Sequence, residues 1–320
     1  MGKLVDGKWT NEWLQTSAKG DFVRDETKFR STVSADGSSG FRAEAGRYHL
    51  YVSLACPWAH RVLIARQLKG LQSAISVSVV HPHMAENGWE FGEFPGATPD
   101  PVYGSKYLHE IYTRAKSDYT GRVTVPVLWD RERQTIVNNE SRQILRIFDH
   151  EFDALGNPSV DLCPEEQAAA IDREIDALYG PVNNGVYRAG FAVKQGAYEI
   201  AVRELFSALD SYEARLTQQR FLVGERLSEA DICFFTTLLR FDPVYHYHFK
   251  CNLKRIADYP ALFGYLRDIY QTLGVAEVCN FEHIKHHYFT SHPTVNPNQI
   301  IPLGPPIDLL APHPRVRLSR

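Results

Sequence analysis

The chain has 320 residues, of which 35 are basic and 38 acidic, so its formal net charge is −3. At roughly 150 residues per domain, this length predicts about two domains with a core in each. The apolar fraction of 44% and the charged fraction of 23% are ordinary for a globular protein and exclude wholesale disorder. The near-neutral charge gives no electrostatic support for a nucleic-acid partner or an anionic membrane surface.

No apolar run is long enough to span a membrane, and the N-terminal segment lacks the apolar core of a secretory signal. We therefore expect no membrane partner and a cytoplasmic location. Five cysteines are spread along the chain without any CxxC spacing, which argues against a disulfide scaffold and against a cysteine pair for zinc. They are Cys56, Cys163, Cys233, Cys251 and Cys279.

The first half of the chain alternates strand and helix patterns. Aromatic and β-branched residues predict strands over residues 47–55, 75–80, 123–130 and 134–139, and apolar spacing predicts helices over 56–70 and 140–152. Residues 1–46 are polar and lack a clear pattern, so we expect an irregular N-terminal extension. The stretch 81–121 is long for a loop and is either functional or contains a short helix. We expect an α/β domain over 47–152, with 81–121 as an insertion.

The second half is dominated by helical patterns. They cover residues 165–180, 197–216, 227–241 and 262–274, which predicts an all-helical domain over 164–290. The tail, residues 291–320, holds seven of the 18 prolines and cannot be a regular helix.

Cys56 stands where a predicted strand ends and a helix begins. Pro57 occupies the first helical position, where the amide proton that proline lacks would have no helical partner. A thiol here faces free backbone amides and the positive end of the helix dipole, which lower its pKa below the ~8.5 of a free cysteine. A buried structural cysteine is the alternative. Ala59 stands where a dithiol exchanger has its second cysteine, so this site needs an external thiol such as glutathione.

Two further motifs could contact a peptide-like ligand. A cis Val125-Pro126 bond would turn the Val125 backbone outward to pair with a ligand, and an edge-strand proline accounts for the motif equally well. Glu140 and Ser141 begin a helix directly after a strand, where they suit an ammonium group and a carboxylate respectively. Ordinary helix capping by Asn139 or Ser141 is the alternative.

Histidines near the end of the helical region raise the question of a metal site. His283 and His287 are four residues apart and could share a helix face. No third ligand of matching pattern accompanies them, and catalytic zinc normally needs three protein ligands. We therefore expect no metal, and we interpret these two, with His246, His248 and His286, as surface or substrate-edge side chains.

Several long motifs resemble the glutathionyl-hydroquinone reductases, which are the xi-class glutathione transferases. They are YVSLACPWAHR, NGWEF, GRVTVPVLWD, NNES, NNGVYRAGFA and IKHHYFTSH, within a resemblance that runs from about residue 40 to 310. The resemblance implies a thioredoxin-like α/β N-terminal domain, an all-α glutathione-transferase C-terminal domain and a homodimer. SEAD at residues 228–231 also resembles the capping box of a core helix in these transferases.

The resemblance also implies a set of site residues. Cys56 would be the nucleophile, and Tyr187 the proton donor beside the aromatic substrate. Tyr245 and Tyr288 would hydrogen-bond the Cys56 thiolate and lower its pKa. Glutathione, as co-substrate and without a metal, would be held by Trp89, Arg122, Val123, Thr124, Val125, Glu140 and Ser141.

The implied reaction reduces glutathionyl-hydroquinones to hydroquinones. The Cys56 thiolate attacks the thioether sulfur and forms a mixed disulfide with glutathione, while the leaving ring carbon takes up a proton. A second glutathione then releases oxidised glutathione. One alternative is an omega-like cysteine transferase that reduces dehydroascorbate or mixed disulfides, against which the 81–121 stretch and the proline-rich tail argue. Another is a non-catalytic protein of this fold that binds aromatic ligands.

Overall fold

The structure is a computed structural model that describes residues 2–11 and 16–319. Residues 1 and 12–15 of the expected N-terminal extension, and residue 320 of the tail, lie outside the described residues. The chain forms two compact units, each built from separated stretches of sequence. The first unit is Met1–Leu14, Arg24–Val160 and Val278–Ser291, and the second is Gln15–Val23, Asp161–Glu277 and His292–Arg320.

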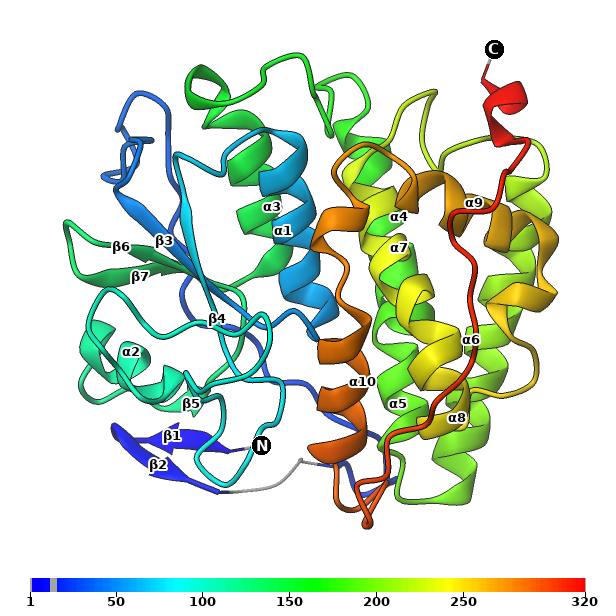
Figure 1. Cartoon of the computed structure of the whole chain (residues 1–320), viewed down its shortest axis with the longest axis horizontal. Helices are drawn as coiled ribbons and strands as arrows, with labels where there is room; N and C mark the ends of the chain where they lie inside the picture. Colours follow the sequence, from blue (N-terminus) through cyan, green and yellow to red (C-terminus); the bar gives the residue numbers. More distant parts are fainter. Residues whose placement is uncertain (1, 12–15, 320) are drawn as a thin grey trace. The chain divides into compact units, whose positions relative to one another are not determined.

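A four-stranded sheet forms the centre of the first unit (Figure 1). Its strands are β3 (Tyr48–Val52), β4 (Ser76–Val79), β6 (Val127–Asp130) and β7 (Thr135–Asn138), in the spatial order β4-β3-β6-β7. β3 runs parallel to β4, whereas β6 is antiparallel to both β3 and β7. Every residue of β3 and β6 is buried, which explains why these strands are rich in aromatic and branched apolar residues on both faces.

Helices complete the thioredoxin-like arrangement of the first unit. α1 (Pro57–Leu68) and α3 (Ser141–His150) pack against each other, and α2 (Leu108–Ala115) lies next to β7. α10 (Phe281–Thr290) also belongs to this unit. We had expected α10 within a C-terminal domain of residues 164–290. However, α10 contacts the segment between β4 and α2, which is distant from it in sequence. These contacts assign it to the first unit instead.

The N-terminal extension is more ordered than the sequence indicated. β1 (Lys3–Val5) and β2 (Lys8–Thr10) form a hairpin, and β1 also pairs with β5 (Gly121–Arg122). The hairpin turns at Asp6 and Gly7, which both have a positive φ, as a tight two-residue turn requires. The expectation of an irregular segment was wrong here, because three-residue strands are too short for an alternating pattern to be recognised.

Two other elements differ from their expected bounds. The stretch 81–121 contains a short helix, α2, which was one of the two interpretations of that stretch. The strand expected over 123–130 forms only as β6, Val127–Asp130, and residues 123–126 are an interruption between it and β5, which belongs to the other sheet. Pro126 explains the interruption, since proline has no amide proton to donate to a strand ladder.

The second unit is helical, as expected. Its helices are α4 (Ala168–Leu178), α5 (Gly185–Gly190), α6 (Gln195–Leu216), α7 (Glu229–Arg240), α8 (His246–His248) and α9 (Pro260–Tyr270). Every residue of α7 is buried, and α4 and α9 pack against it. Two π-helical turns, Tyr179–Asn183 and Phe241–Tyr245, follow α4 and α7. Each turn contains a proline, which cannot donate the regular helical hydrogen bond.

The capping box at the start of α7 is confirmed. The Asp231 carboxylate accepts the Ser228 amide at 2.9 Å and the Ser228 hydroxyl at 2.6 Å. It also accepts the Leu222 amide at 2.8 Å and the Tyr265 hydroxyl at 2.7 Å. Asp231 is fully buried, and that burial raises the pKa of its carboxyl group. The box therefore does more than cap a helix, because it ties α7 to α9 and to the loop before α7.

The tail is irregular until a 3-10 helix, Arg315–Leu318, close to the C-terminus, as its proline content predicted. The buried guanidinium group of Arg315 donates hydrogen bonds to the carbonyl oxygens of Leu216, Gln219 and Arg220 at 2.7–2.9 Å. These carbonyls lie at the end of α6 and just beyond it, where a helix has no internal donors left for them. The tail is thus anchored to the second unit.

None of the helices in residues 2–11 and 16–319 combines the length and the apolar character that a membrane crossing requires.

Candidate functional site

Cys56 is the N-cap residue of α1, and Pro57 is the first residue of that helix. The thiol lies 3.6 Å from the carbonyl oxygen of Val125, to which it donates a hydrogen bond. Cys56 is partly exposed, whereas Cys163, Cys233 and Cys251 are buried. Burial raises the pKa of Cys251 far above that of a free thiol. Accessibility and the helix dipole therefore both make Cys56 a better candidate nucleophile than these three.

The segment before β6 faces Cys56 and is held in place by a tyrosine of α2. The Val125-Pro126 peptide bond is cis, as one of the two interpretations of this motif requires. The Tyr112 hydroxyl donates to the carbonyl oxygen of Thr124 at 2.8 Å and accepts the Thr124 amide at 3.2 Å. Asn139 donates to the same hydroxyl at 3.1 Å. Sequence reasoning missed Tyr112, since nothing in a helical pattern marks a residue that fixes a distant loop.

Arg122 in β5 has an unsatisfied donor. Its Nε atom donates to the Asp25 carboxylate at 3.2 Å. Its Nη1 atom is buried and has no hydrogen-bond partner within the part of the chain that the structure describes. A buried guanidinium donor without a partner is costly, and a ligand carboxylate or carbonyl would satisfy it. Asp25, from the N-terminal extension, was not foreseen, because the extension showed no pattern.

Glu140 is the N-cap residue of α3, and Ser141 is the first residue of that helix. The Glu140 carboxylate accepts the Arg142 amide at 3.3 Å and the Thr27 hydroxyl at 3.3 Å. The structure therefore assigns the capping role to Glu140 and not to Asn139 or Ser141. The carboxylate side chain is 28% exposed, which leaves part of it accessible to a ligand ammonium group.

Trp89 lies in the segment between β4 and α2, and its side chain is buried. Its carbonyl oxygen accepts the Leu108 amide at 2.9 Å, which attaches this segment to the start of α2. The indole ring stacks on the imidazole of His287, with 4.9 Å between ring centroids and 26° between ring planes. His287 precedes Tyr288 in α10, and Tyr288 is also buried.

Tyr187 and Tyr245 lie together in the second unit. Their ring centroids are 5.9 Å apart, and each ring is 5.5 Å from that of Phe249. Tyr245 is fully buried, and Tyr187 retains 8% exposure. Gly190, at the end of α5, allows the Phe249 ring to approach, since a Cβ atom at that position would clash with it. The structure thus brings the two expected tyrosines into one aromatic cluster within this unit.

Of the two interpretations of the histidines, as surface or as substrate-edge side chains, the first was wrong for three of them. His248, His283 and His287 are all less than a tenth exposed. Helix α10 packs its histidine face against the segment between β4 and α2, and a single sequence does not indicate which face of a helix meets a distant loop. His283 and His287 each contact a backbone carbonyl oxygen, which is a structural contact and needs no metal.

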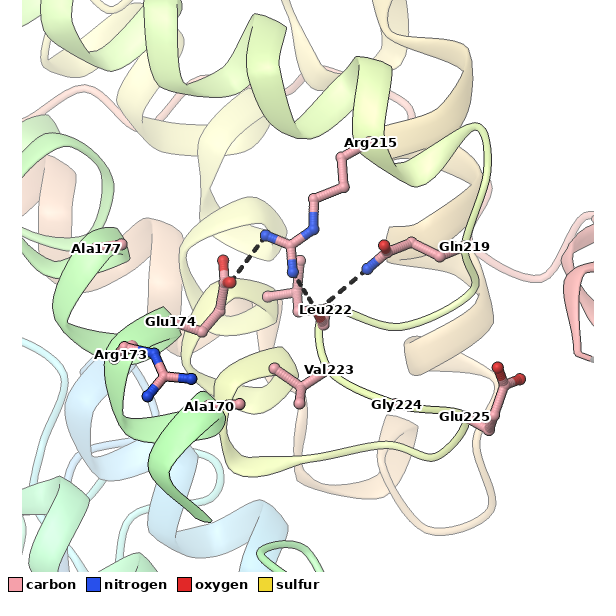
Figure 2. A pocket seen from close by; sticks show the side chains of 10 residues that line it. All are labelled: Ala170, Arg173, Glu174, Ala177, Arg215, Gln219, Leu222, Val223, Gly224 and Glu225. Atoms are coloured by element: carbon pink, nitrogen blue, oxygen red, sulfur yellow. Dashed lines mark hydrogen bonds and ion pairs between the residues drawn. The ribbon is translucent and has the colours of Figure 1, made fainter. Parts of the chain in front are cut away.

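A cavity of about 620 Å³ opens in the second unit, between α4, the end of α6 and the loop that follows α6 (Figure 2). The Arg215 guanidinium group crosses it and donates to the Glu174 carboxylate at 2.8 Å and to the carbonyl oxygen of Leu222. None of the described lining residues is among those that the resemblance implies. The ion pair joins Arg215 and Glu174 across the cavity, and we assign the cavity no role in the reaction.

Two family models match the chain. The model of the glutathione S-transferase N-terminal domain matches residues 55–151, and that of the C-terminal domain matches residues 195–268. Among curated proteins, the chain is 54% identical to glutathionyl-hydroquinone reductase YqjG of Escherichia coli, covering 98% of both chains. It is 51% identical to glutathionyl-hydroquinone reductase PcpF of Sphingobium chlorophenolicum, covering 95% of this chain and 96% of that protein.

Solved structures agree with these relatives. A xi-class transferase from Natrialba magadii has a TM-score of 0.94 and 53% identity, covering 100% of this chain and 98% of that chain. The glutathione-bound structure of YqjG from Escherichia coli has a TM-score of 0.91 and 52% identity, covering 98% of this chain and 99% of that chain. With a thioredoxin-like sheet, a helical second unit and an N-cap cysteine in a monothiol motif, the chain belongs to the glutathionyl-hydroquinone reductases, the xi class of the glutathione transferases.

Proposed function

We propose that this protein uses glutathione to reduce glutathionyl-hydroquinones to hydroquinones. The observation that carries the proposal is the partly exposed thiol of Cys56 at the start of α1, with Ala59 in place of a second cysteine. The thiolate attacks the thioether sulfur, so that an S–S bond forms and the bond between sulfur and the ring carbon breaks. The ring carbon keeps the electron pair and takes up a proton. A second glutathione thiolate then attacks the mixed disulfide, which yields glutathione disulfide and regenerates Cys56.

Glutathione binds to the first unit in this proposal. The buried Nη1 donor of Arg122 supports a contact with a ligand carboxylate or carbonyl. The backbone of Val123, Thr124 and Val125 would pair with the tripeptide, and the contact between Val125 and the Cys56 thiol supports this position. Glu140 and Ser141 would bind the γ-glutamyl end at the N-terminus of α3. Trp89 would pack against the ligand.

Tyrosine side chains act as the general acid and as hydrogen-bond donors in the proposed reaction. Tyr187, which keeps some exposure within the aromatic cluster, would give the proton to the ring carbon of the leaving hydroquinone. Tyr245 and Tyr288 would hydrogen-bond the Cys56 thiolate. We assign glutathione binding to the first unit and the aromatic ring of the substrate to the helical second unit.

The decisive experiment measures turnover of a glutathionyl-hydroquinone by the purified protein. We expect one glutathione to be consumed and one glutathione disulfide to form for each hydroquinone released, and a much lower rate with dehydroascorbate. Tyr187→Phe should slow the ring-releasing step. Turnover of dehydroascorbate alone would reject this function and favour an omega-like transferase.

We also propose that the protein acts in the cytoplasm as a homodimer. None of the cysteines in the described part of the chain forms a disulfide, which suits a reducing compartment. Light scattering of the purified protein should give twice the mass of one chain, and a monomer at micromolar concentration would contradict this assembly.

A further inference from the structure

Helix α10 is tied to the segment between β4 and α2 by two histidines on one face. His287 Nδ1 lies 2.8 Å from the carbonyl oxygen of Pro82, and His283 Nε2 lies 2.7 Å from that of Pro95. A carbonyl oxygen can only accept, so the proton of each ring is on the nitrogen that faces it. The two imidazoles are therefore hydrogen-bond donors, with opposite tautomers when neutral.

The contact at Pro82 is reinforced by the next residues of the segment. His83 Nδ1 hydrogen-bonds the Thr290 hydroxyl at 2.9 Å. The Met84 amide donates to the Ser291 hydroxyl at 2.9 Å. Thr290 and Ser291 end α10. The last turn of α10 thus holds Pro82, His83 and Met84 in place. These residues cannot move relative to it without breaking hydrogen bonds among largely buried groups.

His287 contacts this segment a second time through its ring. The imidazole stacks on the Trp89 indole, 4.9 Å between centroids and 26° between planes, and both side chains are 7% exposed. His283 differs in this respect, because its ring meets Phe94 edge-on at 5.1 Å. One imidazole therefore holds both the start of the segment, by a hydrogen bond, and the indole, by stacking.

We propose that His287 is a positioning residue for glutathione, which holds the Trp89 indole in the orientation that the tripeptide requires. This inference rests on the proposed function, in which Trp89 contacts glutathione. The imidazole acts through Trp89 and has no part in the chemical steps. Because binding and not chemistry depends on it, its loss should raise the KM for the glutathionyl-hydroquinone, whose tripeptide occupies this site, and leave kcat nearly unchanged.

The test compares variants that separate the two contacts of His287. In His287→Asn the amide nitrogen can replace Nδ1 toward Pro82, but the stacked ring is lost. We expect the KM for the glutathionyl-hydroquinone to rise about tenfold, with kcat within about twofold of wild type. His287→Phe keeps an aromatic ring against Trp89, and we expect it to bring KM back to within about threefold of wild type. Thermal melts verify that each variant is folded.

His283→Gln is the matched control, since its amide nitrogen can replace Nε2 toward Pro95 and the residue does not stack on Trp89. We expect its KM to stay within about twofold of wild type. A double-mutant cycle then tests the coupling. In a Trp89→Ala background, His287→Asn should change KM by less than about twofold, because the ring that it positions is gone.

Several results would overturn the inference. They are an unchanged KM in His287→Asn, an equal rise in His283→Gln, and a full tenfold effect of His287→Asn on top of Trp89→Ala. Calorimetric titration of the Cys56→Ser protein with glutathione separates this inference from the proposed function. If that protein binds no glutathione, both fail; if it binds and the cycle is additive, only the role of His287 fails.

Discussion

The thiol of Cys56 points at the carbonyl oxygen of Val125, 3.6 Å away, across the gap between the start of α1 and the segment that leads into β6. A carbonyl oxygen accepts a hydrogen bond from a thiol but has no proton to donate to a thiolate. Ionisation of Cys56 therefore breaks this contact, and the thiolate depends on the helix start and on nearby donors for its stability.

We expect Cys56→Ser to lower the turnover of glutathionyl-hydroquinone at least about 1000-fold, since a serine hydroxyl does not ionise near neutral pH and cannot form the mixed disulfide. Cys279→Ser is the matched control, because Cys279 is the other partly exposed thiol. Turnover assays and mass spectrometry of the trapped glutathione adduct measure the effect. Substantial turnover in Cys56→Ser would contradict the mechanism.

Alkylation with iodoacetamide should follow the same order of accessibility. Cys56 should be modified first, and Cys163, Cys233 and Cys251 only after unfolding, because they are buried. Peptide mapping over time at pH 7 provides the measurement. The account of Cys56 would fail if it reacted as slowly as the buried thiols.

Arg122→Lys should weaken glutathione binding by about tenfold or more. Lysine keeps the positive charge, but it cannot reproduce the planar, forked arrangement of donors in the guanidinium group. The buried Nη1 donor of that group has no hydrogen-bond partner within the described residues. The KM for the glutathionyl-hydroquinone and a calorimetric titration with glutathione measure this change. Asp25→Asn is the companion variant, since it weakens the ion pair with Nε and leaves Nη1 in place. An Arg122→Lys protein with wild-type affinity would remove Arg122 from the binding site.

Acid should destabilise the protein below about pH 6.5, the pKa of a histidine in an unfolded chain. Burial, followed by the positive charge of Arg131, lowers the pKa of His49 to about 4. Arg131 donates to His49 Nδ1 at 3.2 Å, which requires that nitrogen to be unprotonated. The unfolded chain therefore binds the proton more readily, so the stabilisation is complete above pH 6.5 and is lost as the pH falls toward 4.

The size of this effect can be measured by urea unfolding at pH 7 and pH 5. His49 alone should cost about 2 kcal/mol of unfolding free energy at pH 5, as an order of magnitude. His49→Gln should reduce the pH dependence by about that amount. His246→Asn serves as the control at a histidine that is only partly buried. Equal pH dependence in wild type and His49→Gln would refute the assignment.

Asp231→Asn should destabilise the second unit by about 3 kcal/mol. The carboxylate accepts from Ser228, Leu222 and Tyr265, and an amide nitrogen would face donors where an acceptor is needed. Ser228→Ala removes only the capping hydroxyl and should cost about 1 kcal/mol. Chemical denaturation of both variants measures the difference. Equal losses would show that the capping contact, and not the wider network, carries the stability.

Local patterns in the sequence determined a large part of this protein. The order of strands and helices, the position of Cys56 at a strand-to-helix junction and the Ser228–Asp231 capping box depend on residues within a few positions of one another. Such features are visible in one sequence because periodicity and capping act over one or two turns of chain. The long motifs around Cys56, Tyr187 and Tyr288 also carried the family resemblance.

Tertiary structure alone decided how distant residues meet. Periodicity does not indicate that Asp25 pairs with Arg122, that Tyr112 holds Thr124, or that β1 completes a sheet with β5. His283 and His287 show the limit most clearly, because their spacing suggested a shared helix face but not what that face would meet. The ring nitrogen of His287 donates to the carbonyl of Pro82, 205 residues away in sequence, and that of His283 to the carbonyl of Pro95, 188 residues away. Only the folded chain brings such groups within hydrogen-bonding distance.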